Sequence, residues 1–303
     1  MADRPLRILH LVRNADTGGL LRYVVDLATA MHDAGHSVTI ASDTGPAQDL
    51  LDRAPFQTIR IPLMGGPRSF RNCVRLLHDM PCDILHAHYR RATLLGRRLQ
   101  KTNSVPLLYT LHLSHMKTSW WRRALNDFGD HTHVAAEEAR QWLIDEEHIP
   151  AEQITLIPHG IDTARFPQRD DRTMANARAE LNLPPDALVA AYVGRFDEPK
   201  NESWLIDLAL QMPSIHLVLA GAGPHERALE QSIEKNNLNG RVKMIGYRDP
   251  LLIYQAADAL LLPSSREGFA LACAEAMSVG VPVLRTRTSG TAAMIIEGET
   301  GQS

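Results

Sequence analysis

The sequence predicts an α/β protein built from two doubly wound parallel sheets, and three observations lead to that prediction. Short β-rich runs alternate with longer helical patterns along most of the chain, which is typical of parallel sheets wrapped by helices. The alternation stops at a polar, turn-rich stretch near residues 165–185 and then starts again. A length of 303 residues also suits two domains of ordinary size better than one.

The first predicted domain covers residues 1–168. Its first helix has apolar residues at helical spacing from Leu20 to Met31 and stops at Gly35. The helix should therefore pack on the sheet. The expected strands of this domain are RILHLV (7–12), SVTIAS (37–42), CDILHAH (82–88) and PLLYTLH (106–112).

The second predicted domain covers residues 169–303. Its expected strands are ALVAAYVG (187–194), HLVLAGAG (216–223), VKMIGY (242–247), ALLLPSS (259–265) and PVLRT (282–286). Ligands of open parallel sheets bind beyond the carboxyl ends of the strands, so two such domains facing each other would make a cleft. Functional residues are therefore expected at strand ends.

Composition and charge exclude several classes of protein. The net charge is −3 and 44% of the residues are hydrophobic, which suits a globular chain and not a disordered one. Cys73, Cys82 and Cys273 lie in apolar segments without C-x-x-C spacing, so neither a disulfide framework nor a zinc site is expected. The N-terminus lacks a signal peptide's apolar stretch, and no run reaches membrane-spanning length. We expect a cytoplasmic protein without a nucleic-acid partner.

One part of the first domain is strongly basic. Residues 60–123 contain twelve Lys and Arg residues and only two Asp residues. Within this basic region, Trp120 and Trp121 precede Arg122 and Arg123. Such a mixture suits a membrane interface or an anionic acceptor, and packing of an ordinary helix explains it equally well. The hypothesis from charge is that the basic region guides the protein to acidic acceptors or, as a peripheral protein, to the anionic inner face of a membrane.

Two predicted loops contain candidate phosphate-binding residues. Gly18 and Gly19 follow the first strand, where glycines let backbone amides approach an anion at a helix N-terminus. An ordinary tight turn is the alternative. Arg195 and Lys200 follow the first strand of the second domain, where two cations can neutralise a diphosphate, although a solvated loop is slightly favoured when this stretch is taken alone. Neither the first loop nor GAGPHE (221–226) has G-x-G-x-x-G spacing, so a nicotinamide-binding site is not expected.

The stretch SREGFALACAEAM (265–277) is the most specific pattern. It predicts a loop that contains Glu267, followed by a helix from about Ala270 to Val279. Glu275 lies among apolar residues of that helix, and a buried carboxylate without partners is costly. Eight helical residues rise about 12 Å, an upper limit on the axial separation of the carboxylates and close to the distance between sugar and ribose in a nucleotide-sugar. We predict that Glu275 binds a ribose and Glu267 the transferred sugar.

Histidines end two of the predicted strands. His86 and His88 end one strand, and His112 ends the next. A histidine at a strand end is more often structural than catalytic. The H-x-H pair suggests a metal, but two residues that share a strand face do not supply a full ligand set. The chain also contains no D-x-D triplet, the usual acidic site for a metal-bound nucleotide-sugar. We therefore expect no metal.

Taken in order, these motifs resemble the family-4 retaining glycosyltransferases, or glycosyltransferase group 1. The GT-B architecture of that family has two Rossmann-like, doubly wound parallel-sheet domains that face each other across a cleft. The resemblance covers nearly the whole chain, and its last long stretch, with Glu267 and Glu275, is the most specific. The matching stretches are ILHLVRNADTGGLLRYVVDLATAMHDAGHSVTIAS, CDILHAH, LLYTLH, IPHGIDTARF, YVGRFDEPK, LAGAGP, IGY, LLLPSSREGFALACAEAMSVGVPV and GETG.

The resemblance implies roles for the loop residues. The N-terminal domain would face the acceptor, with Gly18 and Gly19 near the donor phosphates and His112 near the donor sugar. The C-terminal domain would bind the nucleotide-sugar donor. Its Arg195 and Lys200 would bind the diphosphate and stabilise it as the leaving group.

The glutamates and the backbone between them receive roles in the same way. Glu267 would face the donor sugar and Glu275 the ribose, and the implied catalytic set is therefore Glu267 with His112, Arg195 and Lys200. The backbone that would bind the phosphate and the sugar is that of Gly268, Phe269, Ala270 and Leu271. The family needs no metal or other cofactor and transfers with retention, by front-side attack in which the leaving diphosphate helps to deprotonate the acceptor. Stabilisation of that leaving group would be the main catalytic effect.

The chain departs from the family pattern at several positions. Asn201 stands where a glycine usually follows the lysine, Ala136 replaces a frequent serine, and Ala293 replaces a frequent glutamate. The chain stops at Ser303, whereas relatives continue through further helices, so we expect a C-terminal truncation.

The leading hypothesis is a hexosyltransferase of class EC 2.4. It would move a sugar from a nucleotide-sugar to a glycan, lipid-linked or small-molecule acceptor. A nucleotide-sugar binding protein without transfer activity is the alternative, favoured by the missing C-terminus and by Ala293. A nicotinamide-dependent enzyme is a third interpretation that the glycine spacing does not support.

Overall fold

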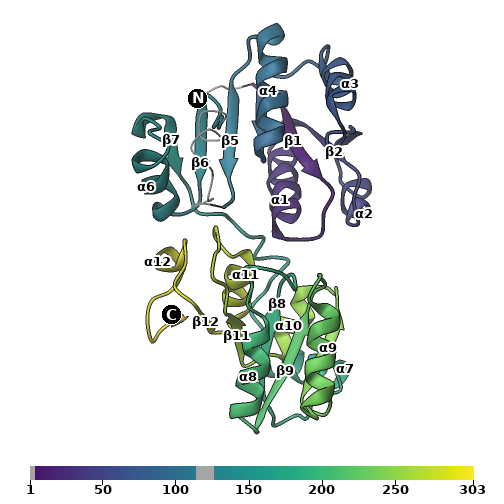
Figure 1. Ribbon diagram of the computed structural model, residues 1–303, viewed down its shortest axis with the longest axis vertical. Helices are drawn as coiled ribbons and strands as arrows, with labels where there is room; N and C mark the ends of the chain where they lie inside the picture. Colours follow the sequence, from purple (N-terminus) through teal and green to yellow (C-terminus); the bar gives the residue numbers. More distant parts are fainter. Residues whose placement is uncertain (1–3, 114–125) are drawn as a thin grey trace. The chain divides into compact units, whose positions relative to one another are not determined.

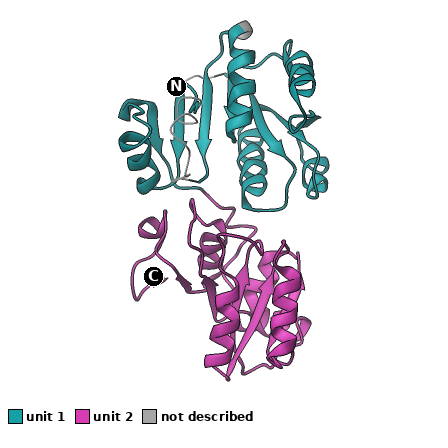
Figure 2. Ribbon diagram, viewed as in Figure 1, with its two compact units in different colours: residues 1–159 teal, residues 160–303 magenta. Residues whose placement is uncertain are grey.

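The computed structural model describes residues 4–113 and 126–303. The chain forms two compact units, residues 1–159 and 160–303 (Figure 2). Each unit is a parallel sheet flanked by helices, which confirms the predicted α/β fold class (Figure 1). The predicted motif at Trp120 to Arg123 lies outside the described residues.

Unit 1 contains a seven-stranded parallel sheet in the order β3-β2-β1-β4-β5-β6-β7. Its strands are β1 (Arg7–Asn14), β2 (Ser37–Asp43), β3 (Gln57–Arg60), β4 (Ile84–Ala87), β5 (Leu107–Leu111), β6 (His131–Val134) and β7 (Ile154–Leu156). Its helices are α1 (Gly19–Asp33), α2 (Gln48–Asp52), α3 (Pro67–Leu77), α4 (Arg90–Asn103) and α6 (Glu137–Asp145), with a short 3-10 turn (Ala151–Gln153). Every residue from Ile8 to Val12 is buried, because helices cover both faces of this central strand.

Unit 2 contains a six-stranded parallel sheet in the order β10-β9-β8-β11-β12-β13. Its strands are β8 (Leu188–Val193), β9 (Ile215–Ala220), β10 (Val242–Gly246), β11 (Ala259–Leu262), β12 (Val283–Arg285) and β13 (Gly301–Gln302). Its helices are α7 (Asp171–Glu180), α8 (Ser203–Gln211), α9 (Glu226–Lys235), α10 (Pro250–Ala256), α11 (Leu271–Val279) and α12 (Thr291–Met294). The five expected strands of this domain correspond to β8 to β12, and the edge strand β13 was not expected.

The polar stretch between the domains contains helix α7. Asp170 caps this helix by accepting a hydrogen bond from the Thr173 amide, and the Thr173 hydroxyl accepts one from the Asp170 amide. Arg178 is 5% exposed and donates two bonds of 2.8 Å to Asp258. Phe166, upstream of α7, is also buried and accepts a bond at its carbonyl from Ser278. Residues 160–180 thus pack on unit 2, whereas the sequence analysis divides the domains between residues 168 and 169.

Both sheets have a point at which the strand order reverses. In unit 1 this switch point lies between β1 and β4, and in unit 2 it lies between β8 and β11. Ligands of doubly wound sheets bind at the carboxyl ends of the strands beside such a point, because the loops diverge there. Gly18 and Gly19 follow β1, Lys200 follows β8, and Glu267 follows β11. The fold therefore places these predicted residues at the two switch points.

Helix α11 has the bounds that the sequence predicts to within one residue. It covers Leu271–Val279 and ends at Gly280, which has a φ of 87°. Glycine adopts this left-handed conformation without strain and is common at helix C-termini. No helix in residues 4–113 and 126–303 combines the length and hydrophobicity of a bilayer-spanning segment.

Candidate functional site

Lys200 and Glu267 meet at the switch point of unit 2. The Lys200 ammonium donates a 2.6 Å hydrogen bond to Glu267 Oε1, and the two side chains are 22% and 9% exposed. Lys200 comes from the loop after β8 and Glu267 from the loop after β11. A lysine ammonium has three donor hydrogens, so the bond to Glu267 leaves it able to bind an anion. The carboxylate meanwhile holds the flexible lysine in one position.

Asn201 gives the lysine loop its shape. Its φ is 50°, a left-handed conformation that asparagine accepts more readily than most residues. Its side-chain amide also donates a 2.9 Å bond to the carbonyl of Pro263 at the end of β11. Asparagine therefore supplies the left-handed backbone that a glycine would otherwise supply and adds a link between the loops after β8 and β11.

Arg195 lies in the same loop and is paired with an acid that the sequence analysis did not single out. Arg195 Nε lies 2.9 Å from Asp197 Oδ2, and the arginine side chain is 43% exposed. A guanidinium has five donor hydrogens in a planar fork, a geometry that suits a phosphate. The Tyr192 hydroxyl donates a 2.6 Å bond to the Arg195 carbonyl and fixes the backbone at this position.

The backbone after Glu267 is held in an unusual conformation. Ala270, the N-cap of α11, has φ 60° and ψ 69°, which costs an alanine about 1–2 kcal/mol relative to a right-handed conformation. Gly290 packs against this loop so closely that a Cβ there would lie 3.0 Å from the Gly268 carbonyl oxygen. Strained backbone is retained where neighbouring structure fixes it, and it clusters at ligand sites. The predicted residues Gly268, Phe269, Ala270 and Leu271 therefore form one constrained turn into α11.

Glu275 is buried in α11, as predicted, and has a protein partner that was not predicted. The Tyr254 hydroxyl of α10 donates a 2.7 Å bond to Glu275 Oε2, and the two residues are 0% and 8% exposed. Burial, followed by the charge of Glu275, raises the pKa of Tyr254 well above its usual range. The tyrosine therefore remains a hydrogen-bond donor throughout the physiological range. A carboxylate accepts up to about four hydrogen bonds, so this partner is compatible with a ribose ligand.

In unit 1, His112 lies at one end of a row of three histidine rings that are joined by hydrogen bonds. His112 Nε2 lies 3.2 Å from His88 Nδ1, and His88 Nε2 lies 3.0 Å from His10 Nδ1. Burial lowers the pKa of each of these imidazoles, so the rings are neutral at pH 7. Tyr23 of α1 packs edge-on against His112, with ring centroids 5.3 Å apart, and covers this end of the row. His10 lies inside β1 rather than at its end, so its position in the sequence did not mark it as a candidate.

A second hydrogen-bonded chain crosses the same sheet. His86 Nε2 lies 2.7 Å from the Thr110 hydroxyl, which lies 3.2 Å from His133 Nδ1. His133 Nε2 lies 2.7 Å from the Ile157 carbonyl oxygen, which can only accept a hydrogen. The neutral His133 therefore donates from Nε2 and accepts from the hydroxyl of Thr110. Thr110 in turn accepts from His86, which leaves the lone pair of His86 on Nδ1.

Parts of the basic region are neutralised by acids outside it. Arg60 pairs with Asp52 at 3.2 Å, and Arg97 pairs with Asp127 at 2.7 Å and also with Asp130. In contrast, α3 carries arginines on its solvent side while Cys73 and Leu77 face the core. These exposed arginines are Arg68, Arg71 and Arg75.

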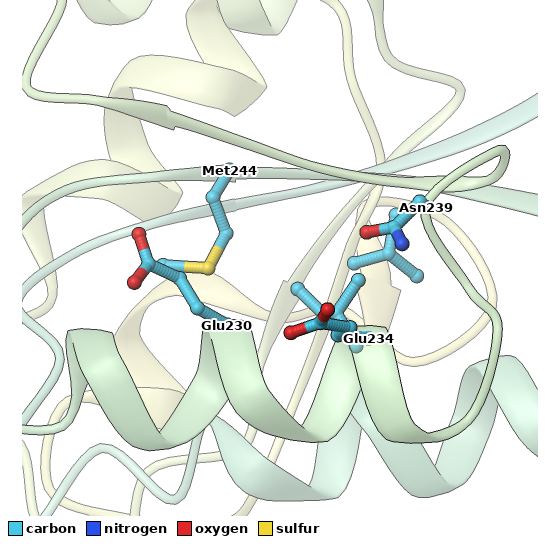
Figure 3. Close-up of a pocket in the computed structure, with 6 residues that line it drawn as sticks. Glu230, Glu234, Asn239 and Met244 are labelled. Atoms are coloured by element: carbon cyan, nitrogen blue, oxygen red, sulfur yellow. The ribbon is translucent and has the colours of Figure 1, made fainter.

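A surface hollow of about 410 Å³ lies between α9 and β10, at the edge of the second sheet (Figure 3). Glu230 lies beside Met244 on one side of it, and Glu234 and Asn239 line the other side. Two carboxylates repel a diphosphate, so this hollow does not suit the predicted donor. The donor candidates lie instead in the loops after β8 and β11.

Two protein-family models match the chain, one for each unit. The model described as Glycosyltransferase Family 4 matches residues 17–165, and the model described as Glycosyl transferases group 1 matches residues 173–302. The D-inositol 3-phosphate glycosyltransferase of Corynebacterium glutamicum is 25% identical over 94% of this chain and 79% of its own length. The phosphatidyl-myo-inositol mannosyltransferase of Mycolicibacterium smegmatis is 24% identical over 94% of this chain and 76% of its own length.

Solved structures share the fold. Anabaena HepE, crystallised with UDP-glucose, superimposes with a TM-score of 0.86 at 22% identity, covering 98% of this chain and 85% of HepE. Sucrose-phosphate synthase from Thermosynechococcus elongatus has a TM-score of 0.81 at 24% identity, with the same coverage. These similarities establish GT-B architecture. With a family model on each unit and glycosyltransferases as its relatives, the chain belongs to the family-4, group 1 glycosyltransferases and is an enzyme of that class.

Proposed function

We propose that the enzyme is a retaining hexosyltransferase that uses a nucleotide-sugar bound by unit 2. The observation that carries the proposal is the Lys200 to Glu267 ion pair at the switch point of the second sheet, with Arg195 in the same loop as the lysine. Two cations suit a diphosphate, and a carboxylate suits sugar hydroxyls. Glu275 lies further along α11 and is assigned to the ribose.

The proposed chemistry depends on stabilising the leaving group. Charge builds on the nucleoside diphosphate as its bond to the sugar breaks, and Lys200 and Arg195 stabilise that charge. The acceptor hydroxyl attacks from the face that the diphosphate leaves, and its proton passes to a phosphate oxygen. The new bond then has the same anomeric configuration as the donor.

Donor and stereochemistry can be tested together. A thermal-shift panel of UDP-, GDP-, ADP- and TDP-sugars first identifies the donor, and inositol 3-phosphate and phosphatidylinositol are the first acceptors because two relatives are named for such compounds. The one-bond coupling between the anomeric carbon and its proton in the product then gives the configuration. An α-linked product from an α-linked donor is expected, and a β-linked product contradicts the proposal.

We also infer that donor binding needs no metal. The sequence has no D-x-D triplet, and Lys200 and Arg195 already supply two positive charges for the diphosphate. Turnover in EDTA should equal turnover with added Mg²⁺ or Mn²⁺. A loss of activity in EDTA that Mg²⁺ restores contradicts this inference.

Helix α3 is the element of the basic region proposed to contact an anionic membrane. Its exposed arginines, Arg68, Arg71 and Arg75, lie near exposed apolar side chains, with Leu76 48% and Met64 43% exposed. Cationic and apolar groups together favour an interfacial position on anionic lipid. Replacing the three arginines with alanine should weaken binding to phosphatidylserine vesicles. The control replaces Arg172, Arg227 and Lys235 with alanine, which removes the same charge from unit 2 and should leave vesicle binding unchanged. Equal losses of vesicle binding in the two variants contradict the proposal.

A further inference from the structure

His86 and His88 alone supply too few ligands for a metal ion, and the fold places the imidazole of His10 beside them. Strands β1 and β4 are paired so that His10 is the register partner of His86. His10, His86 and His88 are 0%, 3% and 1% exposed. We propose that these three histidines form a binding site for a dication of the zinc class. The site lies within unit 1 and is independent of the nucleotide-sugar proposal.

The spacing of the ring nitrogens is close to the spacing that one small bound ion needs. One nitrogen from each of the three histidines lies within 4.8 Å of the corresponding nitrogens of the other two. His10 Nδ1 and His88 Nε2 are 3.0 Å apart. Two nitrogens bound to one tetrahedral zinc at 2.0–2.1 Å are about 3.3 Å from each other. Conversion of this pair into two ligands needs a few tenths of an ångström of added separation and a rotation of each ring by about 35°, so that both lone pairs point at the ion. The third nitrogen, which lies within 4.8 Å of the other two, must move by up to about 1.5 Å to reach the same spacing.

His86 has a lone pair in place to act as the third ligand. The chain through Thr110 and His133 to the Ile157 carbonyl leaves the hydrogen of His86 on Nε2 and its lone pair on Nδ1. In the part of the chain that the structure describes, this buried Nδ1 atom has no hydrogen-bond partner. Unpaired buried polar atoms are rare because they lose the hydrogen bonds of water and gain none. A metal ion would supply the missing partner.

The groups around the ligands resemble the support that metal sites need. Histidine ligands are normally oriented by a hydrogen bond from their second nitrogen. His86 Nε2 donates to Thr110 at 2.7 Å, and His88 Nδ1 lies 3.2 Å from His112 Nε2. In the bound state each ring stays neutral, with its hydrogen on the nitrogen that does not face the ion. For His10 that nitrogen is Nε2, which is buried and has no hydrogen-bond partner among the described residues, so two of the three ligands have this support.

The ligand chemistry selects the class of ion. Neutral imidazole nitrogens favour zinc, nickel, copper and cobalt, whereas magnesium and calcium prefer oxygen ligands. Three protein nitrogens leave one tetrahedral position for a water molecule. The site is therefore distinct in kind from a magnesium site on a donor diphosphate.

Cobalt binding to the full chain tests the proposal. Protein freed of metal by a chelator is titrated with Co²⁺, and the visible absorption of tetrahedral cobalt is recorded. One equivalent should bind, Zn²⁺ should displace it, and excess Mg²⁺ should not. The absence of a tetrahedral spectrum, or displacement by Mg²⁺, overturns the proposal.

Variants locate the ion. His86→Asn should weaken Co²⁺ binding by about tenfold or more, and Thr110→Val, which keeps all three ligands but removes the group orienting His86, by about 10–100-fold. His148→Asn is the matched control, because His148 is exposed and its φ of 56° suits asparagine. If His86→Asn does not fold, the proposal is tested by Thr110→Val and by the position of the zinc anomalous signal in crystals of the unmodified protein. Binding unchanged in Thr110→Val, or a zinc peak away from the three rings, overturns the proposal.

Discussion

Lys200 and Glu267 hold each other in place before any ligand arrives. Their 2.6 Å ion pair joins the loops after β8 and β11, and the glutamate is only 9% exposed. Such preorganisation matters because charges already in position need not reorganise during the reaction. Each of the two side chains therefore needs the other to keep its position.

Lys200→Ala should lower kcat/KM for the nucleotide-sugar by about 10²–10³-fold, the usual effect of losing one group that stabilises developing charge. The variant should also melt earlier, because it leaves the carboxylate of Glu267 largely buried without its lysine. Lys235→Ala removes an exposed lysine from α9 and is the control for both measurements. Full activity of Lys200→Ala would show that the lysine has no catalytic role.

Tyr254→Phe tests the partner of Glu275. The change removes the hydroxyl that donates to this buried carboxylate, so the free energy of unfolding should fall by about 1–3 kcal/mol. The KM for the donor should rise as well, since Glu275 loses the bond that orients it. Tyr247→Phe makes the same change at a side chain that is 66% exposed and should alter neither quantity appreciably. Equal stability of the two variants in denaturant titrations would contradict this account.

Residue patterns predicted the location of the acidic groups but not their partners. The apolar neighbours of Glu275 predicted its burial, which is a local property. Its bond to Tyr254 depends on how α10 packs on α11, and no spacing along the chain encodes that packing. For the same reason the sequence showed His86 and His88 but not His10, which joins them through strand register.

At the scale of elements, the turn between β11 and α11 is fixed by a glycine from a distant loop. Gly290 and Gly298 have the same φ of 80°, so alanine at either position costs about 1–2 kcal/mol of backbone strain. An added Cβ at Gly290 would lie 3.0 Å from the Gly268 carbonyl oxygen and 3.2 Å from the Cα of Phe269, whereas at Gly298 nothing described lies within 4 Å. The two substitutions thus differ mainly in their effect on the loop between β11 and α11.

Gly290→Ala should raise the donor KM several-fold, because the new methyl group displaces the backbone predicted to bind the phosphate and the sugar. Gly298→Ala should leave the KM unchanged while losing a similar amount of stability from strain. Steady-state kinetics with thermal melting for both variants separates the two effects. A donor KM that rises equally in both would contradict a specific role for Gly290.

Elements themselves were the most predictable level of the structure. Strands β8 to β11 follow from apolar runs that end at glycine, proline or serine, β12 follows from an apolar run that begins after Pro282, and α11 follows from its glycine stop. The elements that were not predicted are β13 and helix α7, which lie in polar sequence, and the short strands β3, β6 and β7 of unit 1. Helix α7 is stabilised by the cap that Asp170 forms and by the bond from Arg178 to Asp258. The second of these joins residues far apart in the sequence, so no local apolar pattern indicates it.

At the scale of the whole molecule, buried histidines distinguish unit 1 from unit 2. Among the histidines that the structure describes, burial lowers the pKa of six, all of them in unit 1. The lowered pKa is about 4 for His10 and about 3 for His159. These six residues are His10, His86, His88, His112, His133 and His159. The two units should therefore respond differently to acid.

Mild acid should destabilise metal-free unit 1 before unit 2. Below pH 6.5 an unfolded histidine takes up a proton, whereas the buried rings remain neutral until the pH approaches their lowered pKa values. The unfolded state then binds more protons than the folded state, so the free energy of unfolding falls as the pH drops from about 6.5 towards 4. Hydrogen exchange at pH 7.5 and 5.5, corrected for intrinsic rates, should show a larger loss of protection in β1, β4 and β5 than in β8, β9 and β11. His159→Gln removes one such group and should reduce this difference, and an earlier loss in unit 2 would contradict the assignment.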